Sequence, residues 1–306
     1  MYKVLAPAQM HPGRRTLAEF QNYWAQSHGP LFANTKYLRR YVQHLTLPEA
    51  YGSDPAPTFD GVSMFWYDDW RDQRAPSDDA EVNALRQAVR EDDAQLFDRL
   101  PGWPLHHKRA SVVAEERVIV DGQTTPDMVK AIFIATKMPG LSLSEFFDHW
   151  QNVHGPLGSK VPGLRRYVQN HAVPEAYVAT ATQTHDGWAE MWFDDLASLQ
   201  AARKSLEWQA LGEDGATLFT YPMGVGVARE KVQKDLDWQY NDWGVNALSE
   251  DEVRLRLQKD GYKRLAADPD APRKIKAAAA ARALAVWTWE HLVTVDSSSI
   301  DERPER

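Results

Sequence analysis

Cysteine is absent from the 306 residues of this chain. The protein can therefore have no disulfide framework, no thiolate nucleophile and no cysteine-ligated metal. Basic clusters are also missing, since no run of Lys and Arg exceeds two residues and the net charge is −8. This charge balance argues against nucleic acid and against an anionic membrane surface as partners.

Several signals of cofactor binding and of membrane insertion are missing as well. The chain has no Rossmann glycine fingerprint and no P-loop, so a nucleotide cofactor is not expected. No two histidines have the spacing of a helical metal site, and no apolar run approaches the roughly 20 residues that a membrane helix needs. The first residues, MYKVLAPAQM, lack the basic and apolar regions of a signal peptide. We expect a soluble, cytoplasmic protein without metal or cofactor.

Aromatic residues are abundant. The chain contains 12 Trp and 11 Tyr, and 43% of its residues are apolar. Aromatic walls suit both protein cores and pockets for flat apolar ligands. A small apolar aromatic molecule is therefore the expected substrate.

The chain contains an internal repeat. Residues 17–51 and 143–177 align without a gap and are identical at about half of their positions. A period this long indicates a duplicated domain of ordinary size rather than a solenoid. We predict four segments: a first repeat (1–120), a linker (121–127), a second repeat (128–232) and a helical C-terminal arm (233–306).

Each repeat is expected to begin with a strand and then a helix. Thr16 and Ser142 are each followed three residues later by Glu, which is the spacing of a helical capping box. The apolar residues that follow recur on one helical face and lead to His28 and His154. A Gly-Pro pair directly follows each histidine, and we expect it to end the helix there.

The rest of each repeat predicts two strands, a helix and a final strand. This β-α-β-β-α-β order is that of the ferredoxin-like motif. The expected second helices cover 79–97 and 197–209, and the expected final strands cover 106–120 and 223–231.

The C-terminal arm has a different character. Residues 248–265 form an amphipathic pattern with Ser249 as the expected N-cap, and 274–291 form an Ala-rich helix that carries two Trp. The last ten residues are polar and are expected to be disordered. The two Trp suggest self-association, so we expect a homo-oligomer.

Three motifs occur in both repeats: W-x3-HGPL, LRRYVQ, and DG followed by W-(F/Y)-D-D. Together they resemble the EthD family of the dimeric α+β barrel superfamily. The resemblance implies an α+β fold in which the two ferredoxin-like repeats pair their sheets into one intramolecular barrel. The first repeat departs from the pattern, with His44 where the second has Asn170 and Met64 where it has Glu190.

Two pairs of residues are the first candidates for catalysis. An imidazole titrates near neutral pH, so His28 and His154 are candidate general acid/base groups; alternatively, each caps the C-terminus of its helix. Tyr41 and Tyr167 could donate a hydrogen bond to a carbonyl or a developing enolate; alternatively, each is a core tyrosine.

Glu190 breaks the symmetry of the repeat. It shares one strand face with Trp188 and Trp192, and a carboxylate between two indoles is expected to have a raised pKa and to act as acid or base. Alternatively, the side chain is solvated or pairs with an Arg. The remaining candidates are the substrate-binding residues, which are Trp24, Trp150, Trp192, Trp66, Trp188, Arg165 and His185.

The resemblance implies a cofactor-independent enzyme of aromatic catabolism or secondary metabolism. It would perform acid/base chemistry, as a lyase, dehydratase, cyclase or isomerase, on a small aromatic or polyketide-like substrate. We expect two unequal pockets, with the second repeat the more catalytic. One alternative is an oxidoreductase, either a cofactor-free oxygenase or a haem protein with His154 or His28 on the iron. Another is a non-enzymatic protein that binds a small hydrophobic ligand.

Overall fold

A computed structural model defines the fold. It describes residues 2–73, 76–98, 112–125, 127–179, 185–220, 224–235 and 249–259, and single residues or pairs between 267 and 276. The chain divides into two compact units, Met1–Gln233 and Lys234–Arg306.

The first repeat has the predicted order of elements. It comprises β1 (Tyr2–Ala8), α1 (Leu17–Tyr23), a π-helical turn η1 (Trp24–His28), α2 (Gly29–Ala33), β2 (Leu38–Thr46), η2 (Pro48–Gly52), β3 (Gly61–Tyr67), η3 (Trp70–Gln73), α3 (Ala80–Leu96) and β4 (Val112–Val120).

The second repeat follows the same plan. It comprises β5 (Val129–Ala135), α4 (Leu143–His149), a π-helical turn η4 (Trp150–His154), α5 (Gly155–Gly158), β6 (Leu164–Ala172), α6 (Pro174–Ala179), β7 (Gly187–Phe193), α7 (Leu196–Ala202), α8 (Leu206–Leu218) and β8 (Gly224–Asp235).

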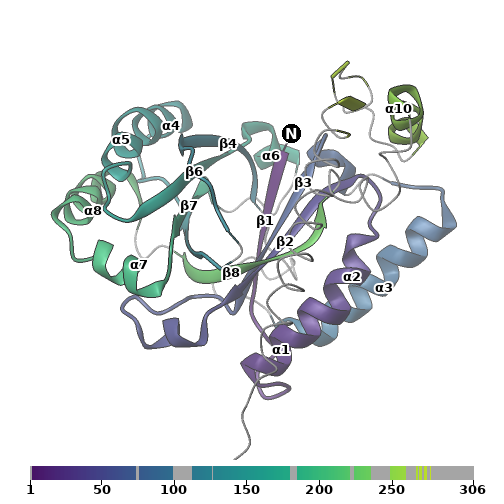
Figure 1. The fold of residues 1–306 in the computed structure, drawn as a ribbon, viewed down its shortest axis with the longest axis horizontal. Helices are drawn as coiled ribbons and strands as arrows, with labels where there is room; N and C mark the ends of the chain where they lie inside the picture. The colour runs from purple at the N-terminus through teal and green to yellow at the C-terminus, as the bar shows by residue number, and fades with distance from the viewer. Residues whose placement is uncertain are drawn as a thin grey trace, which may run out of the picture. The chain divides into compact units, whose positions relative to one another are not determined.

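The eight strands close into one barrel in the order β1-β3-β2-β8-β5-β7-β6-β4 (Figure 1). The last strand of each repeat joins the two halves, because β4 pairs with β1 and with β6 and β8 lies between β2 and β5. The predicted fold of two fused ferredoxin-like repeats in one α+β barrel is confirmed.

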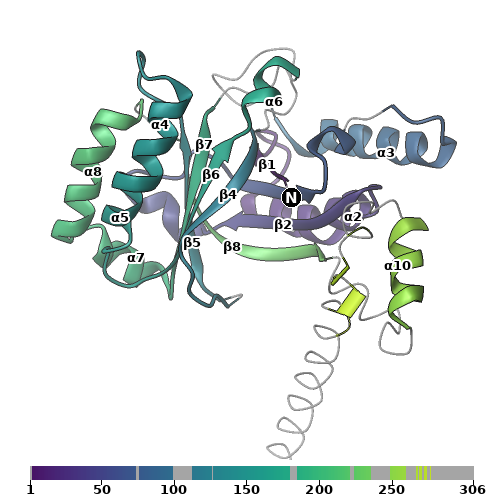
Figure 2. The same cartoon turned by 90° about the horizontal axis from the view of Figure 1, so that it is seen from above.

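The helices cover the outside of the barrel, with α1 to α3 on the side of the first repeat and α4, α5, α7 and α8 on the side of the second (Figures 1 and 2). Successive residues of a strand point to opposite faces. One face of a strand therefore packs inside the barrel, and the other packs against the helices. On β7, Trp188 belongs to the core inside the barrel, whereas Met191 packs beneath the helices of the second repeat.

The first helix does not end at Gly-Pro as predicted. The Gly29 N–H donates to the Trp24 carbonyl across a π turn, and α2 then continues with Pro30 in its first turn. Proline has no N–H to donate, and the carbonyl of Ala25 instead accepts from Gln233 Nε2 at 2.8 Å. Single π turns inside α-helices are frequent at functional sites.

The same π turn occurs in the second repeat, where the Gly155 N–H donates to the Trp150 carbonyl. Gln169 Nε2 donates to that carbonyl as well, at 2.7 Å. As a result, His28 and His154 lie in the middle of a continuous helical segment rather than at its end. Both are buried, with 1% and 7% of their surface exposed.

The expected helix at 197–209 is two helices. Between α7 and α8 the chain turns, and Ser205 caps α8 by accepting from the Trp208 N–H at 3.1 Å. The expected final strand of each repeat is confirmed. The strands begin at Val112 and at Gly224, and residues 106–111 lie outside the described residues.

The second unit contains α10 (Glu250–Lys259). Ser249 caps it as predicted, since its Oγ accepts from the Glu252 N–H at 3.2 Å. Residues 260–265, most of the predicted 274–291 helix with its two Trp, and the chain end lie outside the described residues. Within the described residues, no helix is long and apolar enough to cross a membrane.

Candidate functional site

A histidine–aspartate pair links the two helical layers of the second repeat. His154 Nδ1, from η4, lies 2.8 Å from Asp214 Oδ2, from α8. The other carboxylate oxygen lies 2.9 Å from His149 Nε2. Burial lowers the pKa of His154 below its ordinary value of 6.5, although Asp214 opposes this shift. The imidazole is therefore neutral at pH 7. With its Nδ1 donating to Asp214, Nε2 carries the lone pair.

This histidine lines a cavity of about 400 Å³ between the sheet and the helices of the second repeat. Its volume lies within the range of small-molecule sites. The aromatic and imidazole side chains on its wall are Phe133, Trp150, His154, Tyr167, Trp208 and Phe219.

Part of the cavity wall comes from the first repeat. Asp54 and Pro55, from the loop between β2 and β3, line it. Leu47 and Ala50, earlier in the same segment, belong to the core of the second repeat. The fusion of the two repeats thus contributes to the site itself.

Tyr167 also lines the cavity. Its oxygen accepts from Gln169 Nε2 at 3.0 Å, and burial raises its pKa to about 12. The phenol therefore keeps its proton at neutral pH and can donate it in a hydrogen bond. The ring packs closely against α5, because a Cβ on Gly158 would lie 2.7 Å from Tyr167 Cε1.

The first repeat contains the same polar pair. His28 Nδ1 lies 2.6 Å from Asp92 Oδ2, and the Tyr23 hydroxyl donates to the other oxygen at 2.5 Å. Tyr41 accepts from Gln43 Nε2 at 2.9 Å, as Tyr167 does from Gln169.

The packing beside this pair differs between the repeats. Phe65 occupies the position of Met191, and its ring centroid lies 4.8 Å from that of Tyr41. Phe32 occupies the position of Gly158, with ring centroids 4.6 Å from Phe65 and 5.3 Å from Tyr41. Two aromatic rings therefore pack next to Tyr41, where the second repeat has the smaller Gly158 and the flexible Met191.

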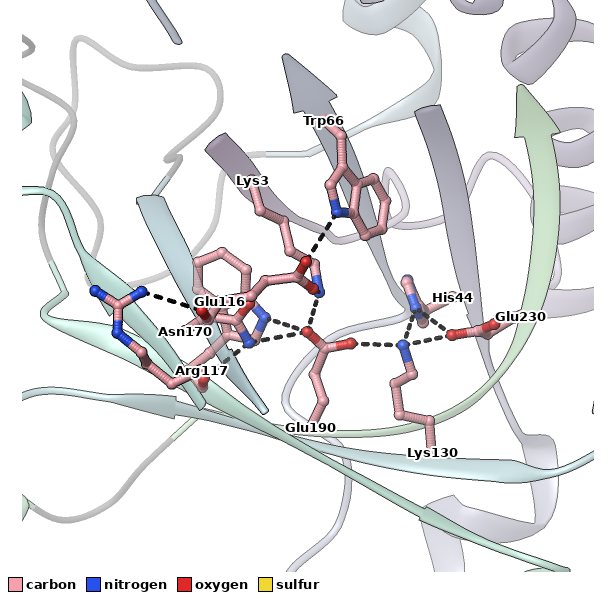
Figure 3. A network of polar contacts seen from close by, with 10 residues as sticks. Lys3, His44, Trp66, Glu116, Arg117, Lys130, Asn170, Glu190 and Glu230 are labelled. Atoms are coloured by element: carbon pink, nitrogen blue, oxygen red, sulfur yellow. Dashed lines mark hydrogen bonds and ion pairs between the residues drawn. The ribbon is translucent and has the colours of Figure 1, made fainter. Parts of the chain in front are cut away.

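Glu190 lies inside the barrel (Figure 3). Its neighbour Met191 lines the cavity, so the two side chains point to opposite faces of β7. The Glu190 carboxylate binds Lys130 Nζ at 2.6 Å and also pairs with Lys3. The prediction of a raised pKa for Glu190 is wrong. Burial raises this pKa, but the charges of Lys130 and Lys3 together hold it well below its usual range. Glu190 is therefore an anion at neutral pH, which does not suit it to acid/base catalysis there.

The charges inside the barrel alternate in sign. Lys3 also binds Glu116 Oε1 at 2.9 Å, and Lys130 also binds Glu230 Oε1 at 2.5 Å. The order is Glu116–Lys3–Glu190–Lys130–Glu230 (Figure 3).

The tryptophans that were predicted to wall one pocket lie in two different parts of the molecule. Trp66, Trp188 and Trp192 lie in the barrel; for example, the Trp188 indole donates to Glu190 at 2.9 Å, and Lys130 Nζ lies 4.0 Å from the centre of the Trp192 ring. A pocket walled jointly by Trp24, Trp150 and Trp192 is therefore wrong. Only Trp150 of these three lines the cavity.

Two other candidates lie away from the cavity. Arg165 is exposed and holds Asp194, with Arg165 Nε 2.8 Å from Asp194 Oδ1. His185 precedes β7 and is not part of the cavity wall; burial lowers its pKa to about 4.

Sequence reasoning missed Asp214 and Arg203. The signal for Asp214 was present, since E-D-x-A-x-L-F occurs in both repeats, at 91–97 and 213–219. Arg203 lies in the turn between α7 and α8, a break that the periodicity did not reveal. Among the described residues, no group of three or more His, Asp or Glu is arranged to hold a metal ion.

Fold and site together define a fused, two-repeat dimeric α+β barrel with a His–Asp pair beside an apolar cavity. The family model of the EthD domain matches residues 14–100 and 138–220, which is more than half of the chain. The chain therefore belongs to the EthD family. No curated protein matches it.

Several solved structures are similar to this chain. An EthD-family protein from Bacillus halodurans is 28% identical over 34% of this chain and 99% of its own, with a TM-score of 0.29. An anthrone oxidase-like protein is 10% identical over 77% and 94%, with a TM-score of 0.47. A mutant chlorite dismutase from Candidatus Nitrospira defluvii is 12% identical over 74% and 90%, with a TM-score of 0.37. These likenesses are too remote to inform the chemistry.

Proposed function

We propose that the protein is a cofactor-independent enzyme that moves a proton on a small aromatic substrate bound in the cavity of the second repeat. The observation that carries the proposal is the neutral imidazole of His154, held by Asp214 at the wall of an apolar cavity of about 400 Å³. A general base near neutral pH needs this combination of protonation state and access to the substrate.

The proposed reaction begins with a substrate whose C–H lies beside a carbonyl group. His154 Nε2 takes the proton, and the C–H electron pair moves into an enolate. The Asp214 carboxylate stabilises the imidazolium that forms, and the Tyr167 hydroxyl donates to the enolate oxygen. Return of the proton to another position gives an isomerisation; loss of a leaving group gives a lyase or dehydratase reaction.

A neutral probe tests proton transfer without knowledge of the natural substrate. 2-Tetralone is a flat bicyclic ketone with acidic C–H groups, and its exchange with D2O is followed by NMR. We expect the protein to accelerate the exchange and His154→Gln to lower the catalysed rate by about 10²–10⁴-fold. An unchanged rate in a folded His154→Gln variant would contradict the proposal.

The two alternative functions have separate readouts. A Soret band in the absorption spectrum of the purified protein would assign the site to haem and overturn the proposal. Tight binding of aromatic ligands without any exchange would instead favour a binding protein.

A further inference from the structure

One cation lies on the wall of the cavity. Arg203, in the turn between α7 and α8, lines it. The Nη2 group of Arg203 is buried and has no hydrogen-bond partner among the described residues. Asp54 also lines the cavity and is exposed. Its charge acts on Arg203, but the two side chains form no ion pair within the described part of the chain.

Two other arginines of the same unit each hold a carboxylate, although Arg39 Nε, like Arg203 Nη2, is buried without a hydrogen-bond partner among the described residues. Arg165 holds Asp194 on the surface, and Arg39 Nη1 lies 2.9 Å from Asp68 Oδ1. A guanidinium stays charged in proteins, and a buried N–H without an acceptor has a free-energy cost. Burial lowers the pKa of Arg203, although the charge of Asp54 opposes this shift. An acceptor supplied by a ligand would remove the cost.

The cavity therefore has two kinds of polar group on an apolar wall. His154 and Tyr167 can serve an uncharged reacting group, since one is a neutral base and the other a neutral donor. Arg203 can serve only an acceptor, because a guanidinium has no acceptor atom. Its planar fork matches a carboxylate, which it can bind through two parallel hydrogen bonds.

We propose that Arg203 binds the carboxylate of the substrate, so that the ligand class of this cavity is an aromatic carboxylic acid. This assignment rests on the proposed function for the choice of cavity, and it adds the charge of the substrate. The exposed Asp54 does not exclude an anion, because water and salt screen its charge. Arg203 is then a specificity-determining residue that orients the acid, with the reacting carbon left to His154.

The test compares two ligands of the same shape and different charge. Binding of 2-naphthoate and of the neutral 2-naphthamide is measured by calorimetry on the full-length protein. We expect 2-naphthoate to bind more tightly by roughly tenfold to a hundredfold, the range for hydrogen bonds to charged groups. We expect Arg203→Gln to remove this preference, and Arg203→Lys to retain part of it.

Arg165→Gln is the matched control, because it changes the net charge equally at a surface site outside the cavity. We expect it to keep the preference for 2-naphthoate. The melting temperature of each variant shows whether it is folded. An equal affinity for the two ligands in the unmodified protein, or a preference that survives Arg203→Gln, would overturn the assignment.

These outcomes separate the assignment from the proposed function. Loss of the carboxylate preference in Arg203→Gln, together with an unchanged 2-tetralone exchange rate in His154→Gln, would support the binding site and refute the chemistry. The absence of a carboxylate preference, together with loss of exchange in His154→Gln, would refute the role of Arg203 and leave proton transfer intact.

Discussion

At the scale of single residues, the chemistry of His154 depends on which of its ring nitrogens carries the proton. Asp214 accepts from Nδ1, so the lone pair lies on Nε2. His149 shares the same carboxylate, and its proximity lowers the pKa of His154. Asp214 is thus a positioning residue that acts through the imidazole rather than on the substrate.

Replacement of Asp214 by Asn tests this role. An amide can donate to Nδ1, which would place the proton on Nε2 and remove the base. We expect the exchange rate of 2-tetralone to fall by about 10²–10⁴-fold. Asp92→Asn, the same change in the first repeat, is the control and should leave the rate within a few fold. The reverse pattern would place the chemistry in the first repeat.

The pH dependence of the exchange rate gives a second test of the roles of His154 and Asp214. The pKa of His154 lies below 6.5, so the base is present at neutral pH and is lost only as the pH falls through this lowered value. Asp214 raises the pKa of His154. Its replacement by Asn should therefore move the acid limb of the residual exchange rate to lower pH, whereas a shift to higher pH would contradict the assignment.

At the scale of the elements, each strand of the second sheet separates two environments. Met191 on β7 faces the cavity, and its neighbour Glu190 faces the charges inside the barrel. Phe65 at the equivalent place in the first repeat contacts Tyr41. The difference between the two repeats therefore involves two positions, where Phe65 and Phe32 of the first repeat replace Met191 and Gly158 of the second.

Replacement of Met191 by Phe should close the cavity. The larger ring would occupy the space beside Tyr167, as Phe65 does beside Tyr41. We expect calorimetric binding of 2-naphthamide to weaken by at least about tenfold, while overpacking costs about 1–3 kcal/mol of stability. Met191→Leu, which conserves volume, is the control. Undiminished binding in Met191→Phe would show that the ligand lies elsewhere.

The sequence predicted helix starts better than helix ends. Capping boxes at Thr16 and Ser142 depend on neighbouring residues, and both are present as expected. The continuation through Gly29 and Pro30 could not be read locally, because the partner of the Ala25 carbonyl is Gln233, at the far end of the unit.

The candidate site was predictable only where it depends on residues close together in the sequence. Helical periodicity places Trp150 and His154 on one face, and both line the cavity with Tyr167; their catalytic role stays a prediction. Glu190 was misjudged because alternation along a strand does not tell which face lies inside the barrel. Its partners Lys3 and Lys130 come from other strands, and one of them from the other repeat.

At the scale of the whole barrel, Glu190 connects the two repeats. It is fully buried and binds one lysine from each half. Met64 takes its place in the first repeat, so one carboxylate serves both lysines. A second carboxylate at the equivalent position would add a like charge nearby, whereas removal of Glu190 would leave the two cations without their shared partner.

Replacement of Glu190 by Gln should destabilise the protein by about 1–3 kcal/mol, the range for hydrogen bonds to charged groups, because Lys3 and Lys130 each keep a second carboxylate. Urea unfolding at pH 7 measures it, with Glu175→Gln on the exposed part of α6 as the control. A loss below about 1 kcal/mol would show that the pairing of the halves does not depend on this carboxylate.

We expect low pH to destabilise the protein through protonation of Glu190. The lowered pKa of Glu190 means that its stabilisation is complete above the ordinary carboxyl value of 4.5 and is lost as the pH falls through the lower folded value. We expect the unfolding free energy to decline below about pH 4.5, with a smaller decline in Glu190→Gln. Equal declines would assign the acid sensitivity to other carboxylates.

The most direct test of the account is a comparison of the two histidines. His154→Gln and His28→Gln make the same change at equivalent helical positions, one beside the cavity and one beside packed aromatic rings. The measurement is the rate of deuterium incorporation into 2-tetralone by each purified, folded variant. The account predicts that the catalysed rate is lost in His154→Gln and retained in His28→Gln. Loss in His28→Gln with retention in His154→Gln would contradict it.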